Sequence, residues 1–140
     1  MLTRRGFTGF ATCAICAVTD FIASGASAQN APPANGGITR KIKSQMDGPA
    51  AGYVTINMEV GIEAGAVIPR HTHPGIESGY VVEGSLELPI DGQPTLMLKA
   101  GDGFQVPTAV PHAGGKASDK KTTLALTYVV EKDKPLASPA

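Results

Sequence analysis

The sequence predicts an all-β domain, built as a sandwich or a barrel, on two observations. Its 17 glycines and 11 prolines in 140 residues leave little room for long helices and favour many strands separated by turns. Between these turns, apolar residues recur at every second position, which is the period of a strand with one buried face. With 42% hydrophobic and 17% charged residues, the composition is that of one ordinary globular domain.

The first 28 residues predict an export signal peptide. Arg4 and Arg5 precede an uncharged stretch over residues 6–18, and residues 26–28 (Ala-Ser-Ala) offer the small side chains of a cleavage site. The run Thr-Arg-Arg-Gly-Phe resembles the core of a twin-arginine export signal, although the two residues that follow depart from it. A membrane anchor is the alternative, but the uncharged stretch is shorter than the roughly 20 residues of a spanning helix. We therefore expect cleavage, a periplasmic or secreted location, and no stable membrane span afterwards.

Both cysteines, Cys13 and Cys16, fall inside this predicted signal. Their C-x-x-C spacing is found in redox and zinc sites, but no second pair is present to complete a tetrahedral zinc site. A lipid-modified Cys16 is a further alternative, although no leucine stands three positions earlier. The mature domain is expected to contain no disulfide.

The rest of the chain divides into three predicted parts. Residues 29–45 begin with the Pro, Ala, Asn and Gly composition of a linker and are expected to be flexible, with a first short strand. Residues 46–131 carry the strand patterns and form the predicted barrel. Residues 132–140 are polar, contain proline and show no apolar period, so we expect a disordered tail.

Strand signals follow one another through the barrel region. Apolar residues alternate with other residues over the segments 54–60, 86–90, 96–98 and 124–130. Asp91-Gly92 lies between the second and third segments and is a turn signal, so these two segments predict a hairpin. Periodicity alone does not choose between a sandwich and a barrel.

The charge balance bears on the partners. Twelve basic and 12 acidic residues give a formal net charge of zero, and no long run of one sign occurs. Nucleic acids and acidic membrane surfaces bind basic patches, so neither is an expected partner. The expected partner is a small molecule.

The residues with metal chemistry lie in one short region and at one distant position. His71 and His73 are two residues apart, so on a strand both imidazoles leave from the same face and can share one ion. Glu77 follows a turn-forming stretch that can bring its carboxylate beside them, and His112 lies far off in sequence behind two prolines. Imidazole and carboxylate suit first-row divalent metals such as Fe, Mn, Ni, Cu or Zn. We expect one such ion, with positions left for water or substrate.

These residues and their spacing closely resemble the first sequence motif of the cupin family. That motif runs Gly, five residues, His-x-His, three or four residues, Glu, six residues and Gly. The chain matches every position, with Gly65, His71, His73, Glu77 and Gly84.

The second cupin motif runs Gly, five residues, Pro-x-Gly, two residues, His, three residues and Asn, and it is matched in part. Gly101, Pro107 and His112 are in place, whereas Ala109 replaces the glycine and Lys116 replaces the asparagine. Neither replaced residue is a metal ligand in the family, so the departures concern loop geometry.

The resemblance covers about residues 46–131. It implies a single-domain (type 2) cupin, which is a double-stranded β-helix of jelly-roll type with the metal inside the barrel. The chain has only three histidines, and all three fall on ligand positions of the motifs. The implied ligands are His71, His73, Glu77 and His112.

The resemblance leaves several functions open, because cupins include dioxygenases, isomerases, decarboxylases, lyases, storage proteins and binding domains. The leading interpretation is a small metal-dependent enzyme, dioxygenase-like or isomerase-like, that acts on an oxygen-bearing small molecule. Glu77 would be the fourth ligand or a catalytic proton acceptor. The alternative is a non-catalytic periplasmic cupin that serves as a sensor, carrier or reservoir, and the third is an empty vestigial site. Cupin barrels commonly pair through edge strands, which implies a homodimer.

Overall fold

The structure is a computed structural model that describes residues 36–116 and 119–140, and these residues form strands and no helix. The prediction of an all-β fold is confirmed. The predicted export signal over residues 1–28 and both cysteines lie outside the described residues. In the described part of the chain, no helix is long and apolar enough to cross a membrane.

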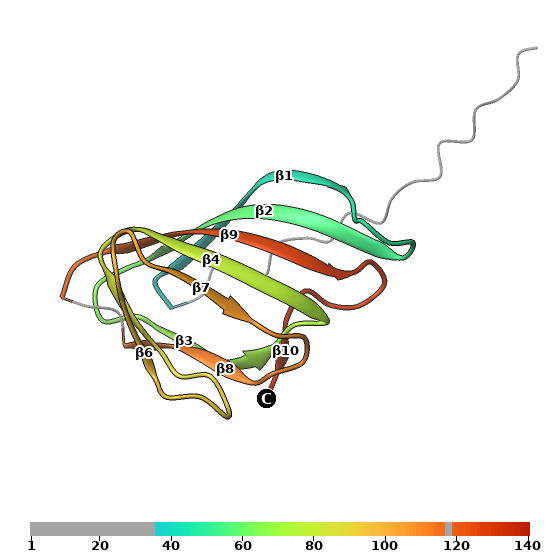
Figure 1. Cartoon of the computed structure of the whole chain (residues 1–140). Coiled ribbons are helices and arrows are strands. Elements are labelled where there is room, and N and C mark those ends of the chain that lie inside the picture. The colour runs from blue at the N-terminus through green and yellow to red at the C-terminus, as the bar shows by residue number, and fades with distance from the viewer. Residues whose placement is uncertain (1–35, 117–118) are drawn as a thin grey trace, which may run out of the picture.

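The described residues form ten strands in three antiparallel sheets. Their bounds are β1 (Ile38–Asp47), β2 (Tyr53–Ile62), β3 (Val67–Thr72), β4 (Gly75–Glu83), β5 (Ser85–Leu88), β6 (Leu96–Lys99), β7 (Gly103–Val106), β8 (His112–Lys116), β9 (Thr122–Glu131) and β10 (Ser138–Pro139). The largest sheet has the order β1-β2-β9-β4-β7, the second has the order β10-β3-β8, and β5 pairs with β6. In Figure 1 the five-stranded sheet lies over the layer of β3, β8 and β10, which is the expected double-stranded β-helix.

The core lies between the two layers and follows the predicted alternation. On β9 every second side chain is buried, and β2 pairs with it over its whole length, from Tyr53 opposite Glu131 to Ile62 opposite Thr122. The predicted hairpin is also confirmed, because Leu86 pairs opposite Leu98 and both side chains are buried. The apolar faces of these strands therefore form one continuous core.

The first strand is longer than the sequence predicts. Instead of a flexible linker with a short strand before the barrel, β1 starts at Ile38 and pairs with β2 along its length, apart from a bulge between Ile42 and Ser44. Ile38 is buried, and Arg40 and Ile42 are partly buried on the same inner face. Arg40 interrupts the apolar alternation of this strand, so periodicity alone underestimates its length.

The C-terminal segment, residues 132–140, is a second correction, because it packs on the barrel where the sequence predicts a disordered tail. Leu136 is only 5% exposed, and β10 pairs with β3 so that Ser138 lies opposite Thr72. The backbone N–H of Lys132 also donates to the carbonyl of Gly52 at 2.9 Å. A single apolar residue has no period, so tertiary contacts alone reveal the packing of this segment.

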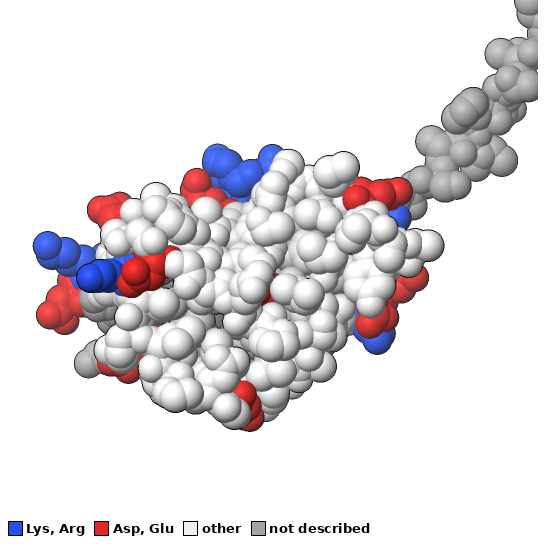
Figure 2. Space-filling view, in the orientation of Figure 1, with Lys and Arg blue, Asp and Glu red and all other residues white. Residues whose placement is uncertain are grey.

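Charged side chains form no basic patch on the face of the molecule shown in Figure 2. On this face Lys, Arg, Asp and Glu lie mainly at the margins, and the centre is almost entirely white. The absence of a nucleic-acid partner and the homodimer both stay predictions from the sequence.

Candidate metal centre

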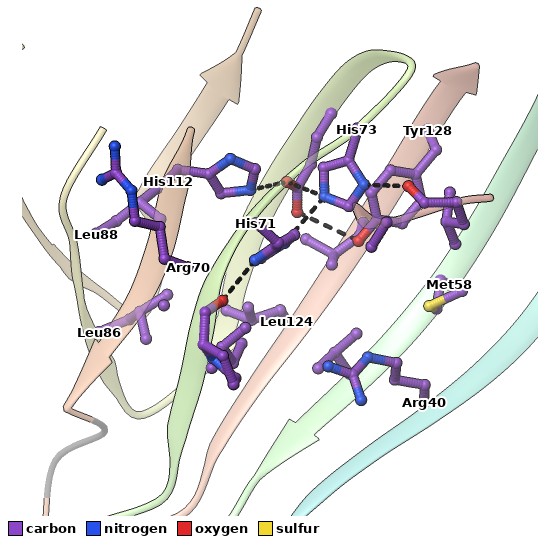
Figure 3. Close-up of a pocket in the computed structure, with 18 of the residues that line it drawn as sticks. Arg40, Met58, Arg70, His71, His73, Leu86, Leu88, His112, Leu124 and Tyr128 are labelled. Atoms are coloured by element: carbon purple, nitrogen blue, oxygen red, sulfur yellow. Dashed lines mark hydrogen bonds and ion pairs between the residues drawn. The ribbon is translucent and has the colours of Figure 1, made fainter. Parts of the chain in front are cut away.

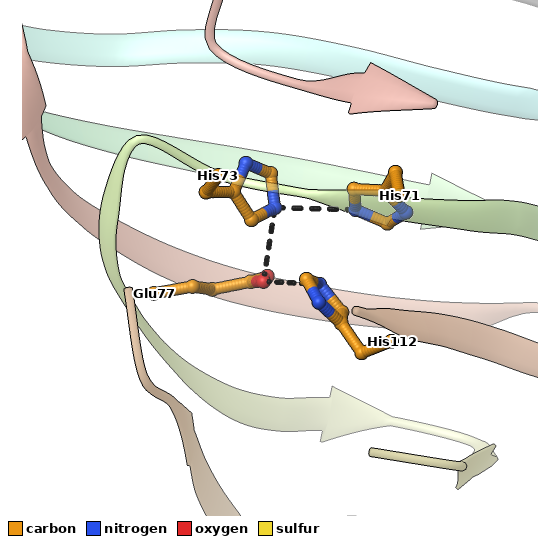
Figure 4. Close-up of side chains that lie close together, drawn as sticks. All are labelled: His71, His73, Glu77 and His112. Atoms are coloured by element: carbon orange, nitrogen blue, oxygen red, sulfur yellow. Dashed lines mark hydrogen bonds and ion pairs between the residues drawn. The ribbon is translucent and has the colours of Figure 1, made fainter. Parts of the chain in front are cut away.

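Three strands bring the four predicted metal ligands together. β3 carries His71 and ends just before His73, β4 carries Glu77, and β8 begins at His112. The antiparallel pairing of β3 with β8 sets His71 directly opposite His112, which closes the large gap between them in sequence. Figure 4 shows the four side chains turned towards a common point.

The donor atoms of these four side chains lie within 4.8 Å of one another. The Nε2 atoms of His71 and His73 are 3.1 Å apart. The Oε2 atom of Glu77 is 3.2 Å from Nε2 of His73 and 3.0 Å from Nε2 of His112. His73, Glu77 and His112 are buried, and His71 is partly buried towards the cavity, so the cluster is shielded from bulk solvent on most sides.

The hydrogen bonds of the three imidazoles fix which ring nitrogen is free. Each Nδ1 atom faces a backbone carbonyl, which can only accept a hydrogen bond: Pro69 for His71 at 2.7 Å, Leu136 for His73 at 2.5 Å, and Val110 for His112 at 3.0 Å. Each Nδ1 atom therefore carries the proton, and in the neutral ring the lone pair is on Nε2. The three Nε2 atoms, with their lone pairs, are therefore left available to the cluster. Metal-binding histidines usually have this arrangement, in which the other ring nitrogen donates to a neighbouring group that fixes the orientation of the ring.

The donor set fits a divalent cation. Two Nε2 lone pairs at 3.1 Å repel each other unless a positive charge lies nearby. Oε2 of Glu77 and Nε2 of His112 are buried without a hydrogen-bond partner, and in the neutral ring their 3.0 Å separation sets a nitrogen lone pair against a carboxylate oxygen. Leaving such atoms unsatisfied costs about 1–3 kcal/mol each. Donors about 2.1 Å from an ion and at right angles lie roughly 3.0 Å apart, close to the distances observed.

The electrostatic environment holds two of the predicted ligands in the forms that could bind a metal at neutral pH. Burial lowers the pKa of His71 to about 4, although its hydrogen bond to the Pro69 carbonyl acts in the opposite direction. Burial alone would raise the pKa of Glu77, but its contacts with His112 and His73 outweigh burial and lower the pKa to about 2. His71 is therefore neutral and Glu77 is ionised.

The pKa of His112 is shifted in the opposite direction to that of His71. Burial tends to lower its pKa, but the contact with Glu77 outweighs this effect and raises the pKa above the ordinary value of 6.5. Near neutral pH a cation must therefore compete with a proton for His112.

Two residues that the sequence does not single out support the ligands. The hydroxyl of Tyr128 donates to Oε1 of Glu77 at 3.3 Å, and its ring lies 4.9 Å from that of His73. Burial and the Glu77 charge raise the pKa of Tyr128 well above 10, so the hydroxyl stays protonated as a donor. The second residue is Leu136, whose carbonyl orients His73. The alternation of apolar residues on β9 predicts that Tyr128 faces inward. Nothing in the sequence predicts that the backbone carbonyl of Leu136 contacts His73.

A cavity of about 270 Å³ opens beside the four donors. Its walls are mostly apolar, and its charged lining residues outside the metal cluster are Arg40 and Arg70. Figure 3 shows the histidines at one side of this cavity and leucines along its wall. The apolar lining includes Met58, Val60, Ile68, Leu86, Leu88, Phe104, Leu124, Leu126 and Leu136.

The fold and the cluster define a class of protein, a double-stranded β-helix with a His and Glu site that could hold a metal ion. The sequence model of the cupin domain matches residues 58–130, which is just over half of the chain. The chain belongs to the cupin family, as the sequence motifs predict. No curated protein sequence matches the chain.

Several solved structures are similar to this chain. An RmlC-like cupin from Shewanella frigidimarina is 26% identical, with a TM-score of 0.58 over 70% of this chain and 80% of that one. KdgF from Halomonas sp. is 25% identical, with a TM-score of 0.58 over 73% of this chain and 89% of that one. The DMSP lyase DddQ from Ruegeria pomeroyi is 23% identical, with a TM-score of 0.57 over 61% of this chain. The match spans only 43% of the lyase, which therefore shows the fold alone.

Proposed function

We propose that this cupin is a small metal-dependent enzyme that acts on an oxygen-bearing small molecule. The observation that supports it best is the convergence of three Nε2 lone pairs and one carboxylate beside a largely apolar cavity. A concave apolar site with a few convergent polar groups is the usual form of a small-molecule site.

In this proposal His71, His73 and His112 hold one divalent ion, which supplies Lewis acidity to an oxygen of the bound molecule. Glu77 is the fourth ligand. The alternative role for Glu77, proton acceptor, is less well supported, because a carboxylate with a pKa of about 2 binds a proton weakly. Tyr128 keeps Glu77 in place through its hydrogen bond, and the apolar walls exclude water from the bound molecule.

A second candidate function is binding without turnover, as a sensor, carrier or metal reservoir. One observation favours it: among the described residues that line the cavity, the titratable groups are the four donors, Tyr128 and two arginines. None of these is a spare general base, because Tyr128 stays protonated and arginines do not release their protons near neutral pH.

Metal analysis and turnover together test the proposal. Purified protein reconstituted with Fe(II), Mn(II), Ni(II) or Zn(II) should bind about one ion per chain, and His71→Ala or His112→Ala should lower this content. Asn57→Ala on the exposed face of β2 is the matched control and should leave it unchanged. Catalysis of small oxygenated substrates by one metal form supports the enzyme, while binding without turnover supports the second candidate. Failure of wild type to bind any of the four metals would contradict both.

The proposed location is periplasmic or secreted, with residues 1–28 as the export signal. Replacing Arg4 and Arg5 with lysines should retain the protein inside the cell if the twin-arginine route exports it. Cell fractionation with mass spectrometry of the exported chain measures both the location and the cleavage site. Unchanged export of the lysine variant would contradict the twin-arginine route.

A further inference from the structure

A glycine on the inner face of β4 makes room for an aromatic ring of the cavity wall. Gly79 lies two residues after Glu77 and pairs opposite Phe104 of β7. A Cβ atom at Gly79 would overlap the Cζ, Cε1 and Cε2 atoms of Phe104, so the end of this ring lies where any other residue would have its side chain. The φ of Gly79 is outside the left-handed region, so space rather than backbone conformation explains the glycine.

The ring of Phe104 borders the cavity close to the metal cluster. Phe104 is only 8% exposed, and it lines the cavity. Alternate residues of a strand share a face, with a rise of about 3.4 Å per residue, so Gly79 lies about 7 Å along β4 from Glu77. On the other side of Gly79, β9 contributes the buried Leu126, which also lines the cavity. An apolar surface with one aromatic ring therefore adjoins the predicted metal ligands.

The charged groups of the described cavity lining already have interactions of their own. Arg70 forms an ion pair with Asp91, and Arg40 also interacts within the protein. Glu77, the only acidic residue among the described lining residues, belongs to the metal cluster. A charged group on the body of a ligand would therefore lose its water without gaining a dedicated partner, which is costly. The lining favours an uncharged body.

We propose that the cavity selects a molecule with an uncharged aromatic ring, which packs against Phe104, and an oxygen-bearing substituent, which faces the metal ligands. Gly79 is the positioning residue, because it leaves room for the Phe104 ring at the sheet and so keeps the ring out of the cavity. An apolar cavity of about 150 Å³ holds a benzene ring. The cavity of about 270 Å³ beside the histidines (Figure 3) therefore has room for a ring with a short substituent. The orientation of the substituent rests on the proposed function, whereas the choice of an aromatic ring rests on Phe104 and Gly79.

Benzyl alcohol and cyclohexylmethanol are matched probes, because they share one alcohol group and differ in the aromaticity of the ring. NMR chemical-shift titration of the Zn(II)-loaded protein measures both affinities. Phe104→Leu keeps an apolar side chain but removes the ring, so it should lower the ratio of benzyl alcohol affinity to cyclohexylmethanol affinity by about 2-fold to 10-fold. A second pair of probes tests the charge: 4-(aminomethyl)benzyl alcohol should bind at least about 10-fold more weakly than 4-ethylbenzyl alcohol, which has the same shape without the ammonium group.

Gly79→Ala tests the positioning role, since the added methyl group must displace the Phe104 ring. The ring borders the cavity, so we expect it to move into this space and to weaken benzyl alcohol binding by about 10-fold. In a Phe104→Leu background, Gly79→Ala should have little further effect, because its effect acts through the ring. Gly103→Ala is the matched control and should leave the affinity unchanged. Gly103 is exposed on β7, and a Cβ there would be in ordinary contact with the Gly79 carbonyl oxygen at 3.5 Å.

Four outcomes would overturn the proposal: no benzyl alcohol binding by wild type, the same affinity ratio in wild type and Phe104→Leu, equal binding of the ammonium and ethyl probes, or an equal loss in Gly79→Ala and Gly103→Ala. The ratio in Phe104→Leu still decides if Gly79→Ala does not fold. Titration of the metal-free protein separates this inference from the proposed function, because the contacts of the ring need no metal. If the protein takes up no Zn(II), the proposed function loses support, while the ratio still shows whether Phe104 selects an aromatic ring.

Discussion

At the scale of single residues, Ala109 and His112 show how local conformation and charge are tied to the metal centre. Ala109 replaces the glycine of the second cupin motif, and it adopts a φ of 59°, in the left-handed region. Its backbone N–H donates to the carbonyl of His73 at 3.0 Å, so this conformation belongs to a loop that contacts a proposed ligand. The motif prefers glycine here because an L side chain is strained at such a φ.

Ala109→Gly should therefore stabilise the protein. Relief of the left-handed strain exceeds the added flexibility of the unfolded chain, and we expect a gain of about 0.5–1 kcal/mol in the free energy of unfolding. Urea denaturation measures this difference. Ala125→Gly, at an exposed position within β9, is the control and should cost about 0.5–1 kcal/mol. A destabilised Ala109→Gly variant would refute the strain argument.

Metal affinity should fall on acidification, because protons compete for the same lone pairs. Among the groups with shifted values, the pKa of His112 is raised above 6.5, whereas the pKa values of His71 and Glu77 are lowered to about 4 and about 2. Affinity is thus full above the His112 pKa and should drop at least about tenfold per pH unit below it. Competition with a chromophoric chelator from about pH 8 to about pH 5 measures this slope. A flat profile would show that His112 is not a ligand.

At the scale of elements, the C-terminal segment, residues 132–140, makes contacts beside the metal centre that the other strands do not make. It supplies the Leu136 carbonyl to Nδ1 of His73, buries the Leu136 side chain, and adds β10 to the edge of β3 beside His71. This segment lies beyond residues 58–130, the part that matches the cupin domain. The cluster of predicted metal ligands therefore also has contacts from chain outside the matched domain.

Deletion of residues 132–140 should weaken metal binding by about 10-fold to 100-fold, because His73 loses the acceptor that orients it. Leu136→Ala is the matched control, since it keeps the backbone carbonyl and removes only the buried side chain. That variant should lose about 2–5 kcal/mol of stability and keep most of its metal affinity. Metal titration with parallel thermal denaturation compares the two. Wild-type affinity in the shortened chain would contradict the role of this segment.

At the scale of the whole molecule, the proposed metal ties the layers of the barrel together. Its ligands come from β3 and β8 in one sheet and β4 in the other, with His73 in the link between β3 and β4. An ion bound there stabilises the native state because the unfolded chain cannot assemble these ligands.

Saturation with metal at about 100 times its dissociation constant should add about 2.7 kcal/mol to the free energy of unfolding and raise the melting temperature by roughly 10–20 °C. Differential scanning calorimetry with and without a chelator measures the shift. His71→Ala should show a much smaller one. An unchanged melting temperature in wild type would mean that no ion bridges the sheets. The predicted homodimer is a separate matter, which sedimentation velocity can decide.

The sequence by itself determined the all-β class, the hairpin through Asp91-Gly92, and the four clustered donor side chains. Each has a local pattern in the sequence. Alternation of apolar residues indicates a strand with one buried face, turn residues indicate a reversal of the chain, and imidazole together with carboxylate indicates metal binding. Only the tertiary structure decided the full length of β1, the inward position of Arg40, and the packing of residues 132–140 against the barrel. These features depend on which distant strands pair and on a backbone carbonyl, and neither leaves a periodic or chemical mark in the sequence.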